Sequence, residues 1–377
     1  MQTKRESRFA PRCRCRHNYQ GDLLMTTTIR YQTDFERQIE FDFLRATEIA
    51  ALNTLQWLGK GQKEMADDAA CDAIRGMFDL MDIQGEVVLG EGIKDEAPGL
   101  FKGEKVGTWK DDSPRFEIAL DPVDGTTNAS KGMPNSLSCI AAAAPNEGQA
   151  CLADIPAFYM KKLAYPLEVR RAWMADPGLP IDIDAPISDV IDATARVLKK
   201  EVRDVVVCVL DRPRNQELIE DVRRKGAALR MIMDGDIASA LAPAMNTSNI
   251  DLYAGIGGTP EAILAAAGLR CLGGGMRAKI WPRDEQERQA LIDAGWGDRL
   301  DKEYMSKDLA RGDNLVFAAT GITTSPLLPG VEVRGSIATT YSVIMRARSG
   351  TVRFVEAQHN LERKTIHLRS TGAERQV

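Results

Sequence analysis

The sequence predicts an α/β protein built of two lobes, and three observations support this. The chain has 377 residues, which is too long for one small core at about 150 residues per domain. From about residue 205, apolar strand-like segments and amphipathic helical segments alternate in a βαβαβα order. Several of the predicted strands end directly in an acidic residue, at the position where open α/β sheets bind ligands.

Composition and charge exclude several classes of protein. Hydrophobic residues make up 44% and charged residues 27% of the chain, as in an ordinary globular protein. The formal net charge of -5 provides no overall basic field for nucleic acid. No apolar run reaches the ~18 residues of a membrane span. We therefore expect neither a nucleic-acid partner nor a membrane partner.

Histidine and cysteine usage narrows the chemistry. The chain has three histidines, which argues against a His-rich zinc site and against a Ser-His-Asp triad. The seven cysteines fall at irregular positions, and three stand in apolar contexts typical of buried, reduced thiols: Cys139, Cys208 and Cys271. With no apolar core of a secretory signal at the N-terminus, we expect a cytoplasmic protein whose chemistry is carried by carboxylates.

Residues 1–34 form a basic N-terminal extension without helical or strand periodicity. Cys13, Cys15 and His17 could suggest a metal site, but their spacing is cramped and no fourth ligand is near. A disordered extension is the favoured interpretation. Met25 is as sensible a start as Met1, because predicted structure begins only after it.

The predicted N-terminal lobe covers residues 35–200. Apolar residues at helical spacing predict a first helix over residues 35–58, and a second helix follows at about residues 66–81. The segment "GEVVLGEG" reads as a strand that ends at Glu91, and "RFEIAL" reads as a strand that ends at Asp121. The segment "SLSCIAAAA" continues the same sheet.

The predicted C-terminal lobe covers residues 201–370. The continuous apolar run "VVVCVL" is typical of a strand covered on both faces. A helix over residues 215–225, the strand "ALRMIM", a helix from Ile237, the strand "IDLYAGI" and the helix "TPEAILAAAG" follow it. The C-terminal third adds three strands: "NLVFAAT", "IATTYSVIM" and "TVRFVEAQ".

Acidic residues gather at the strand ends and helix starts: Asp67, Asp68, Glu91, Asp121, Asp124, Asp234, Asp236 and Glu261. Each has an ordinary structural explanation, since Asp-Gly pairs form turns and Thr259, Pro260 and Glu261 would make a good N-cap, N1 and N2. Crowding so many like charges is unfavourable unless a cation lies among them. Mg²⁺ and Mn²⁺ prefer such oxygen ligands, so the pattern predicts metal-assisted phosphoryl hydrolysis.

The stretch "DPVDGT" is the most informative of these acidic segments. Pro122 stiffens the link between Asp121 and Asp124, so that both carboxylates can face one centre. Gly125 allows close approach, and Thr126 adds a hydroxyl group. An alternative interpretation is the D-x-D-G-T motif of aspartyl-phosphate phosphatases. The spacing here is one residue longer, and that motif lies on the first strand of its domain, which makes the alternative the weaker one.

"DPVDGT" resembles the D-P-[ILV]-[DE]-G-[ST] motif of the lithium-sensitive sugar-phosphatase superfamily, which includes inositol monophosphatases and fructose-1,6-bisphosphatases. Longer stretches such as "WLGKGQKEMADDAA", "YAGIGGTPEAILAAAG" and "RGDNLVFAATGIT" look like the bacterial class II fructose-1,6-bisphosphatases, from about Gln38 to His359. The resemblance implies the layered sugar-phosphatase fold, with two lobes and mixed sheets between helix layers.

The resemblance also implies a set of site residues. Two metal ions, Mn²⁺ or Mg²⁺, would be held by Asp67 and Glu91 and by Asp121, Asp124 and Glu261. Glu91 and Thr126 would position the attacking water and help to deprotonate it. Substrate contacts carry over to Asp124, Gly125, Thr126, Tyr159, Arg212, Pro213, Arg214, Asp234, Gly235, Asp236 and Gly258. The chain departs from the family pattern at Asn215, where many members have His, and some members have Glu in place of Asp124.

The expected reaction is hydrolysis of the 1-phosphate of fructose 1,6-bisphosphate, a gluconeogenic step, by in-line attack without a covalent intermediate. The helix N-terminus beside Gly125 and Thr126 would receive the phosphate. Sedoheptulose 1,7-bisphosphate remains an open second substrate, and a non-catalytic sugar-phosphate sensor remains an open alternative. Inositol monophosphate fits less well, because Arg212 and Arg214 suit a second phosphate. We expect a homo-oligomer, either a dimer or a tetramer.

Overall fold

The computed structural model describes residues 35–91, 99–145 and 149–376. All of these residues belong to one compact unit, Phe35–Val377. The predicted extension, with its Cys and His residues and the Met25 start, lies outside the described residues. Cys139, Cys208 and Cys271 are buried thiols, as predicted from their apolar contexts, and Cys71 and Cys151 are buried too.

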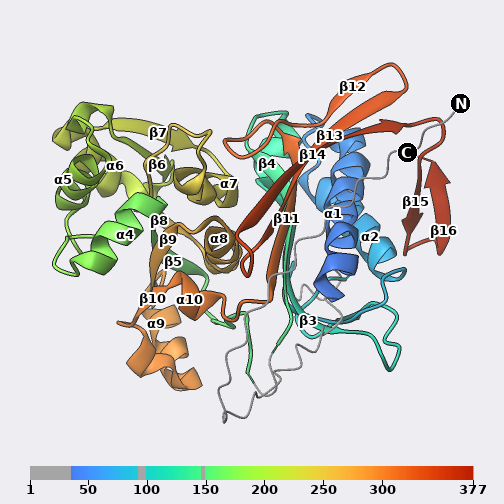
Figure 1. Cartoon of the computed structure of the whole chain (residues 1–377), viewed down its shortest axis with the longest axis horizontal. Coiled ribbons are helices and arrows are strands. Elements are labelled where there is room, and N and C mark those ends of the chain that lie inside the picture. The colour runs from blue at the N-terminus through green and yellow to red at the C-terminus, as the bar shows by residue number, and fades with distance from the viewer. Residues whose placement is uncertain (1–34, 92–98, 146–148, 377) are drawn as a thin grey trace, which may run out of the picture. The chain divides into compact units, whose positions relative to one another are not determined.

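Two mixed sheets form the frame of this unit, in agreement with the predicted fold class (Figure 1). The first sheet has eight strands in the order β12-β13-β11-β4-β3-β1-β2, with β14 paired to β13. Its strands are β1 (Gln84–Leu89), β2 (Lys105–Val106), β3 (Arg115–Asp124), β4 (Ser136–Ala143), β11 (Leu315–Thr323), β12 (Glu332–Arg334), β13 (Ile337–Arg346) and β14 (Thr351–Asn360).

The second sheet has six strands in the order β10-β9-β5-β8-β6-β7. Its strands are β5 (Tyr159–Tyr165), β6 (Val206–Leu210), β7 (Ala228–Ile232), β8 (Leu252–Gly258), β9 (Gly275–Ile280) and β10 (Glu303–Met305). Strand β6 runs parallel to both β7 and β8, as the predicted βαβαβα order requires. A separate hairpin consists of β15 (Thr365–Leu368) and β16 (Ala373–Gln376).

Helices cover both sheets and fill the space between them. They are α1 (Phe35–Thr54), α2 (Lys63–Phe78), α3 (Thr126–Lys131), α4 (Leu167–Ala175), α5 (Ile187–Leu198), α6 (Gln216–Lys225), α7 (Asp236–Leu241), α8 (Thr259–Leu272), α9 (Glu285–Leu291) and α10 (Ser306–Leu309). Figure 1 shows α1 and α2 on one side of the first sheet, α7 and α8 between the sheets, and α4, α5 and α6 beyond the second sheet.

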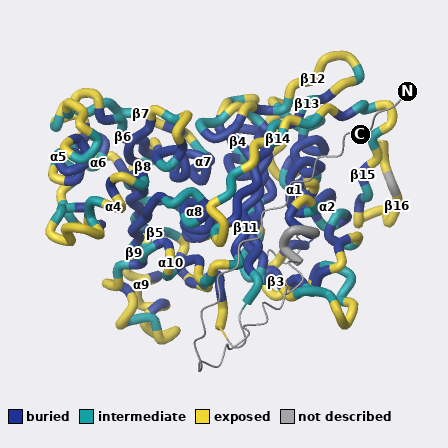
Figure 2. Tube along the Cα trace, in the orientation of Figure 1, coloured by how far each residue is buried: buried dark blue, intermediate teal, exposed yellow. Residues whose placement is uncertain are grey.

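Burial follows this layering, and the central layer is the most deeply buried (Figure 2). Every residue of β4 is buried. Successive side chains point to opposite faces of the sheet, so Cys139 packs into the core on one face and Ile140 into the core on the other. The sequence "TPEAILAAAG" is apolar almost all round, which is typical of a helix with no solvent face. Helix α8 accordingly contacts strands of both sheets.

The predicted lobes, residues 35–200 and 201–370, do not coincide with the two sheets. The second sheet takes β5 from the predicted first lobe, and the first sheet takes β11–β14 from the predicted second lobe. Local patterns reveal strands but not their partners, because pairing is settled by packing between segments far apart in the sequence.

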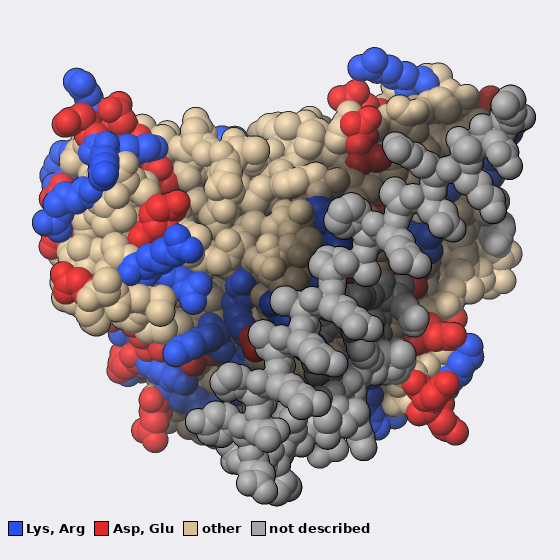
Figure 3. Space-filling view, viewed as in Figure 1, with Lys and Arg blue, Asp and Glu red and all other residues tan. Residues whose placement is uncertain are grey.

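Two surface properties complete the description. Within the described part of the chain, no helix combines the length and the apolar composition that crossing a bilayer requires. On the face that Figure 3 shows, Lys and Arg side chains lie interspersed with Asp and Glu side chains over the α4–α6 region.

Candidate active site

Two Asp-Gly turns face each other between the sheets. Gly125 follows β3 and precedes α3, and Gly235 follows β7 and precedes α7. Both glycines have a positive φ, 81° and 72°, in the left-handed region that favours glycine. A Cβ atom on Gly125 would lie 2.5 Å from the carbonyl oxygen of Asn135, and one on Gly235 would lie 2.3 Å from it. Only glycine permits this close approach.

Each turn supplies a carboxylate to the helix that follows the other turn. Asp124 Oδ2 accepts a hydrogen bond of 3.2 Å from the N–H of Ile237 in the first turn of α7. Asp234 Oδ2 accepts one of 3.1 Å from the N–H of Thr127 in the first turn of α3. A carboxylate at a helix N-terminus is favourable because of the helix dipole. This exchange locks the ends of β3 and β7 together across the two sheets.

Asn135 fastens the same junction from the side. Its Nδ2 donates to the carbonyl oxygens of Asp234, at 2.6 Å, and Gly235, at 2.5 Å. Asn128 Nδ2 donates to the Asp234 carbonyl as well, at 3.0 Å. The two turns therefore act as one rigid unit, which suits a site that must hold charged groups in fixed positions.

A cavity of ≈ 300 Å³ opens beside these turns. Most of the residues predicted for the site line it: Glu91, Asp121, Asp124, Gly125, Thr126, Tyr159, Arg212, Arg214, Asp234, Gly235, Asp236, Gly258 and Glu261. Asp67 does not line it but accepts a hydrogen bond of 3.3 Å from the Thr126 hydroxyl group at its edge. Pro213 lies outside the lining and is exposed.

Strand pairing explains why residues so far apart in sequence meet here. Strands β1 and β3 run parallel, with Leu89 beside Ala119, so Glu91, two residues after β1, and Asp121, in the last part of β3, lie at one edge of the first sheet. In the second sheet, Tyr159 of β5 pairs with Gly258 of β8, just before α8 and Glu261. The ends of strands from both sheets thus form the walls of one cavity.

The carboxylates of this cavity repel one another. Burial, followed by the nearby charge of Glu91, raises the pKa of Asp67 to about 8, against the opposing effect of Lys63. Burial and then the negative charge of Asp124 raise the pKa of Asp121 well above its usual range. In the metal-free protein, these groups therefore cannot all be ionised at neutral pH.

The same holds for the two acids nearest the second sheet. Burial and then Asp236 raise the pKa of Asp124 and of Glu261, although Lys162 opposes the effect at Glu261. Acidic side chains supplied by both sheets therefore form this wall of the cavity, called here the carboxylate wall.

Two arginines, Arg212 and Arg214, line the same cavity and form its cationic wall. The Arg214 guanidinium lies over the Tyr159 ring, 4.2 Å from its centroid, and its Nε donates to the carbonyl oxygen of Ile256 at 3.0 Å. Arg212 Nη2 lies 3.6 Å from Asp234 Oδ1, and both of these side chains are about one-third exposed. The cavity thus has a carboxylate wall and a cationic wall, as a polyanionic ligand bridged by cations would require.

The chain matches the family described as bacterial, glpX-encoded fructose-1,6-bisphosphatase over residues 37–359. It belongs to this family. Two relatives of this class 2 fructose-1,6-bisphosphatase family show the extent of the match. The Haemophilus influenzae class 2 enzyme is 37% identical over 86% of this chain and 97% of its own length. The Escherichia coli K12 fructose-1,6-bisphosphatase 1 class 2 is 36% identical over 87% of this chain and 97% of its own.

A solved structure, an extragenic suppressor from Pyrococcus furiosus, covers 57% of this chain and 72% of its own at 16% identity. Its TM-score of 0.28 is too low to bear on the fold.

The chemistry of the donor set in this fructose-1,6-bisphosphatase family member fits hard metal ions. All five predicted ligands are carboxylates, and Glu261 Oε2 is buried without a hydrogen-bond partner among the described residues. Such an orphaned acceptor is costly unless a cation meets it. As they stand, however, no three His, Cys, Asp or Glu side chains of residues 35–91, 99–145 and 149–376 are arranged to hold an ion. The donor types of the five residues nevertheless fit such ions.

Two buried side chains that hold a residue of the cavity were not predicted from the sequence. Lys162 Nζ and Tyr253 OH both donate to Asp236 Oδ2, at 2.8 and 2.7 Å, and all three residues are buried. The signal for Lys162 was present: in the strand "YMKKLAY" it occupies a core-facing position among apolar residues, where an unpaired lysine is rare. Asp236 was predicted as a substrate contact, and one of its carboxylate oxygens already accepts these two hydrogen bonds from within the protein.

The structure also corrects one sequence prediction about a helix end. Gly258, rather than Thr259, is the N-cap of α8, so Glu261 occupies the third helical position. At the start of α3, beside the Gly125 and Thr126 positions where a phosphate is expected, the N–H of Thr127 donates to Asp234. Only packing between the two turns brings Asp234 there.

Proposed function

We propose that this protein hydrolyses the 1-phosphate of fructose 1,6-bisphosphate to fructose 6-phosphate and phosphate, a step of gluconeogenesis. The observation that carries the proposal is the pairing, in one cavity, of a carboxylate wall with the arginines Arg212 and Arg214. Membership of the bacterial fructose-1,6-bisphosphatase family over residues 37–359 supports it. A sugar with phosphates at both ends would place one phosphate at each wall.

In the proposed mechanism, Mn²⁺ or Mg²⁺ bound by the five carboxylates would polarise the 1-phosphate and lower the pKa of the attacking water. These ligands are Asp67, Glu91, Asp121, Asp124 and Glu261. The Thr126 hydroxyl group, which lies 3.0 Å from the Val123 carbonyl oxygen and 3.3 Å from Asp67 Oδ1, would orient the water for in-line attack. Glu91 would accept its proton, because it lines the cavity from the neighbouring strand end.

The remote phosphate would bind at the cationic wall. Arg214 is fixed by the Tyr159 ring and by the Ile256 carbonyl, so it loses little freedom on binding a phosphate. Arginine recognises phosphate through several parallel N–H donors. Arg212, Tyr159 and Gly258 line the same cavity and complete the proposed contacts.

A phosphate-release panel tests the proposal. The substrates are fructose 1,6-bisphosphate, sedoheptulose 1,7-bisphosphate, fructose 1-phosphate and inositol monophosphate, each with Mg²⁺, Mn²⁺ or a chelator. We expect the fastest release from fructose 1,6-bisphosphate, with none in chelator. Equal rates on the sedoheptulose compound would establish a dual bisphosphatase, and binding without release would establish a sensor. Light scattering on the same sample tests the expected homo-oligomer.

The raised carboxyl pKa values predict how pH affects stability. The metal-free folded protein keeps protons on Asp67 up to about pH 8, whereas the unfolded chain loses them near pH 4. The folded state therefore binds more protons in this window, and its stability falls as pH rises. The buried His359, whose pKa is lowered to about 4, acts in the opposite sense, but only below about pH 6.5.

We therefore expect the melting temperature in chelator to fall by on the order of a few degrees between pH 6.5 and 8. Mn²⁺ should raise the melting temperature more at pH 8 than at pH 6.5, because binding must displace protons. Scanning calorimetry at the two pH values measures both effects. Asp67→Asn is the matched variant and should weaken the dependence, while the raised pKa values of Asp121, Asp124 and Glu261 keep part of it. A Mn²⁺ shift that is larger at pH 6.5 would contradict the metal assignment.

A further inference from the structure

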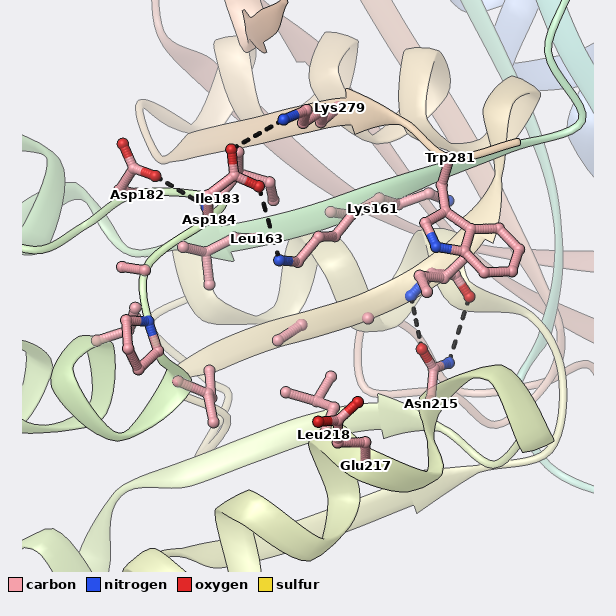
Figure 4. Close-up of a pocket in the computed structure, with 18 of the residues that line it drawn as sticks. Lys161, Leu163, Asp182, Ile183, Asp184, Asn215, Glu217, Leu218, Lys279 and Trp281 are labelled. Carbon is pink, nitrogen blue, oxygen red and sulfur yellow. Dashed lines mark hydrogen bonds and ion pairs between the residues drawn. The ribbon is translucent and has the colours of Figure 1, made fainter. Parts of the chain in front are cut away.

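The segment that carries the two arginines lies between two cavities. On one side is the active-site cavity. On the other side is a cavity of ≈ 510 Å³, between the second sheet and the α5 and α6 region (Figure 4). Arg214 lines both cavities. With a cavity on either side of Arg214, packing constrains this segment less than it would in a core, so directed hydrogen bonds carry more of its positioning.

Asn215, the residue after Arg214, makes these bonds. It is 1% exposed. Its Nδ2 donates to the carbonyl oxygens of Leu210, at 3.1 Å, and Ile256, at 3.3 Å. Its Oδ1 accepts from the N–H of Ile256 at 2.8 Å. Figure 4 shows this amide reaching from the start of α6 to the backbone of β8. One side chain therefore links the end of β6, the arginine segment and β8.

The link acts directly on Arg214. Both side chains bind the same carbonyl oxygen, that of Ile256, with Arg214 Nε at 3.0 Å. The close approach needs Gly255, whose φ is +140° and where a Cβ atom would lie 3.2 Å from Asn215 Oδ1. Two residues beyond Ile256, β8 ends at Gly258, which pairs with Tyr159. The amide thus sets the distance between Arg214 and the ring on which it stacks.

We propose that Asn215 is a positioning residue that holds Arg214 in place for the remote phosphate. This inference rests on the proposed function, since it assigns the residue that orients one end of the same site. Asn215 touches no part of the carboxylate wall through these bonds. Its loss should therefore weaken recognition of the remote phosphate and leave the hydrolytic centre intact.

The test uses Asn215→Asp, which keeps the acceptor for the Ile256 N–H but turns an anionic oxygen toward two carbonyl oxygens. We expect KM for fructose 1,6-bisphosphate to rise about tenfold, with kcat within about threefold of wild type. With Mn²⁺ present, the Kd of the product fructose 6-phosphate should rise by a similar factor in calorimetry. Inhibition by inorganic phosphate, which has no remote group, should be unchanged.

Two further variants complete the design. Asn215→His, whose ring can make one of the three bonds, should give an intermediate KM and replaces Asn215→Asp if that variant does not fold. Glu217→Gln is the control, because Glu217 is exposed and lines the same outer cavity. If wild type neither hydrolyses the bisphosphate nor binds fructose 6-phosphate, the proposed function fails. If wild type does both and the Asn215 variants retain its KM, or lose phosphate inhibition equally, the positioning role is wrong.

Discussion

Replacing Asp121 with Asn is expected to lower kcat by at least about a thousandfold while leaving the protein folded. A metal ion contributes several kcal/mol of transition-state stabilisation, and each 1.4 kcal/mol is about a tenfold change in rate. Asp121 lies near the end of β3, where burial and then the charges of Asp124, Glu91 and Glu261 raise its pKa. Removing one carboxylate from this centre weakens the hold on the metal on which the proposed chemistry depends.

The fold should survive this change for two reasons. Asp121 Oδ1 accepts the N–H of Val123 at 3.0 Å, and an Asn oxygen can accept the same bond. The substitution also removes an acid whose pKa is raised by burial and by its neighbours, and whose ionisation in the unfolded chain therefore opposes folding at neutral pH, so the metal-free melting temperature should stay level or rise.

Phosphate release at saturating Mn²⁺, together with melting in chelator, measures both parts of the Asp121 prediction. Asp112→Asn, an exposed position in the turn before β3, is the control. Activity of the Asp121 variant within about tenfold of wild type would remove Asp121 from the metal site.

Replacing Arg214 with Ala is expected to lower kcat/KM on fructose 1,6-bisphosphate by about 10- to 150-fold. A charge-assisted hydrogen bond to phosphate contributes roughly 1.5–3 kcal/mol, at about 1.4 kcal/mol per tenfold. Most of the loss should appear as a higher KM, because the remote phosphate is held in both the ground state and the transition state. The stacking of the guanidinium on Tyr159 is lost in the same variant.

The comparison with fructose 1-phosphate separates recognition from chemistry. This substrate lacks the remote phosphate, so wild type should hydrolyse it poorly and the Arg214 variant should lose little more. Arg224→Ala is the matched control, since Arg224 is a highly exposed arginine of α6 that pairs with Asp221. Equal losses on both substrates would mean that Arg214 serves the chemistry or the fold instead.

The order of helices and strands could be predicted from the sequence because its signals are local. The run from β6 to α8 has the predicted βαβαβα order, and the strands that deliver Glu91 and Asp121 are present as β1 and β3. Apolar periodicity and turn residues act over a few positions, so they are visible without knowledge of the partner. The first helix ended early, at Thr54, with a short 3-10 turn filling the rest of the predicted range.

The features that were missed all depend on contacts between distant segments. Lys162 lies in a strand, and nothing nearby in the sequence shows that Asp236 would meet it. Asp234 accepts a hydrogen bond from the N–H of Thr127 at the start of α3, although the two residues are 107 positions apart in the sequence. The sequence marked Asn215 only as a position where many family members have His. Its hydrogen bonds to β8 are made with Ile256, which is 41 residues further along the chain.

The sequence by itself determined the fold class, the family and the supply of carboxylates at strand ends, because strand length, burial pattern and motif spacing are written in neighbouring residues. Tertiary structure alone decided which of these acids share a cavity, which are already held by the protein and which arginine faces them. The physical reason is that β3 and β7 belong to different sheets. Their two Asp-Gly turns meet only after α7 and α8 have packed between those sheets, and the charges that shift each carboxyl pKa are assembled at that contact.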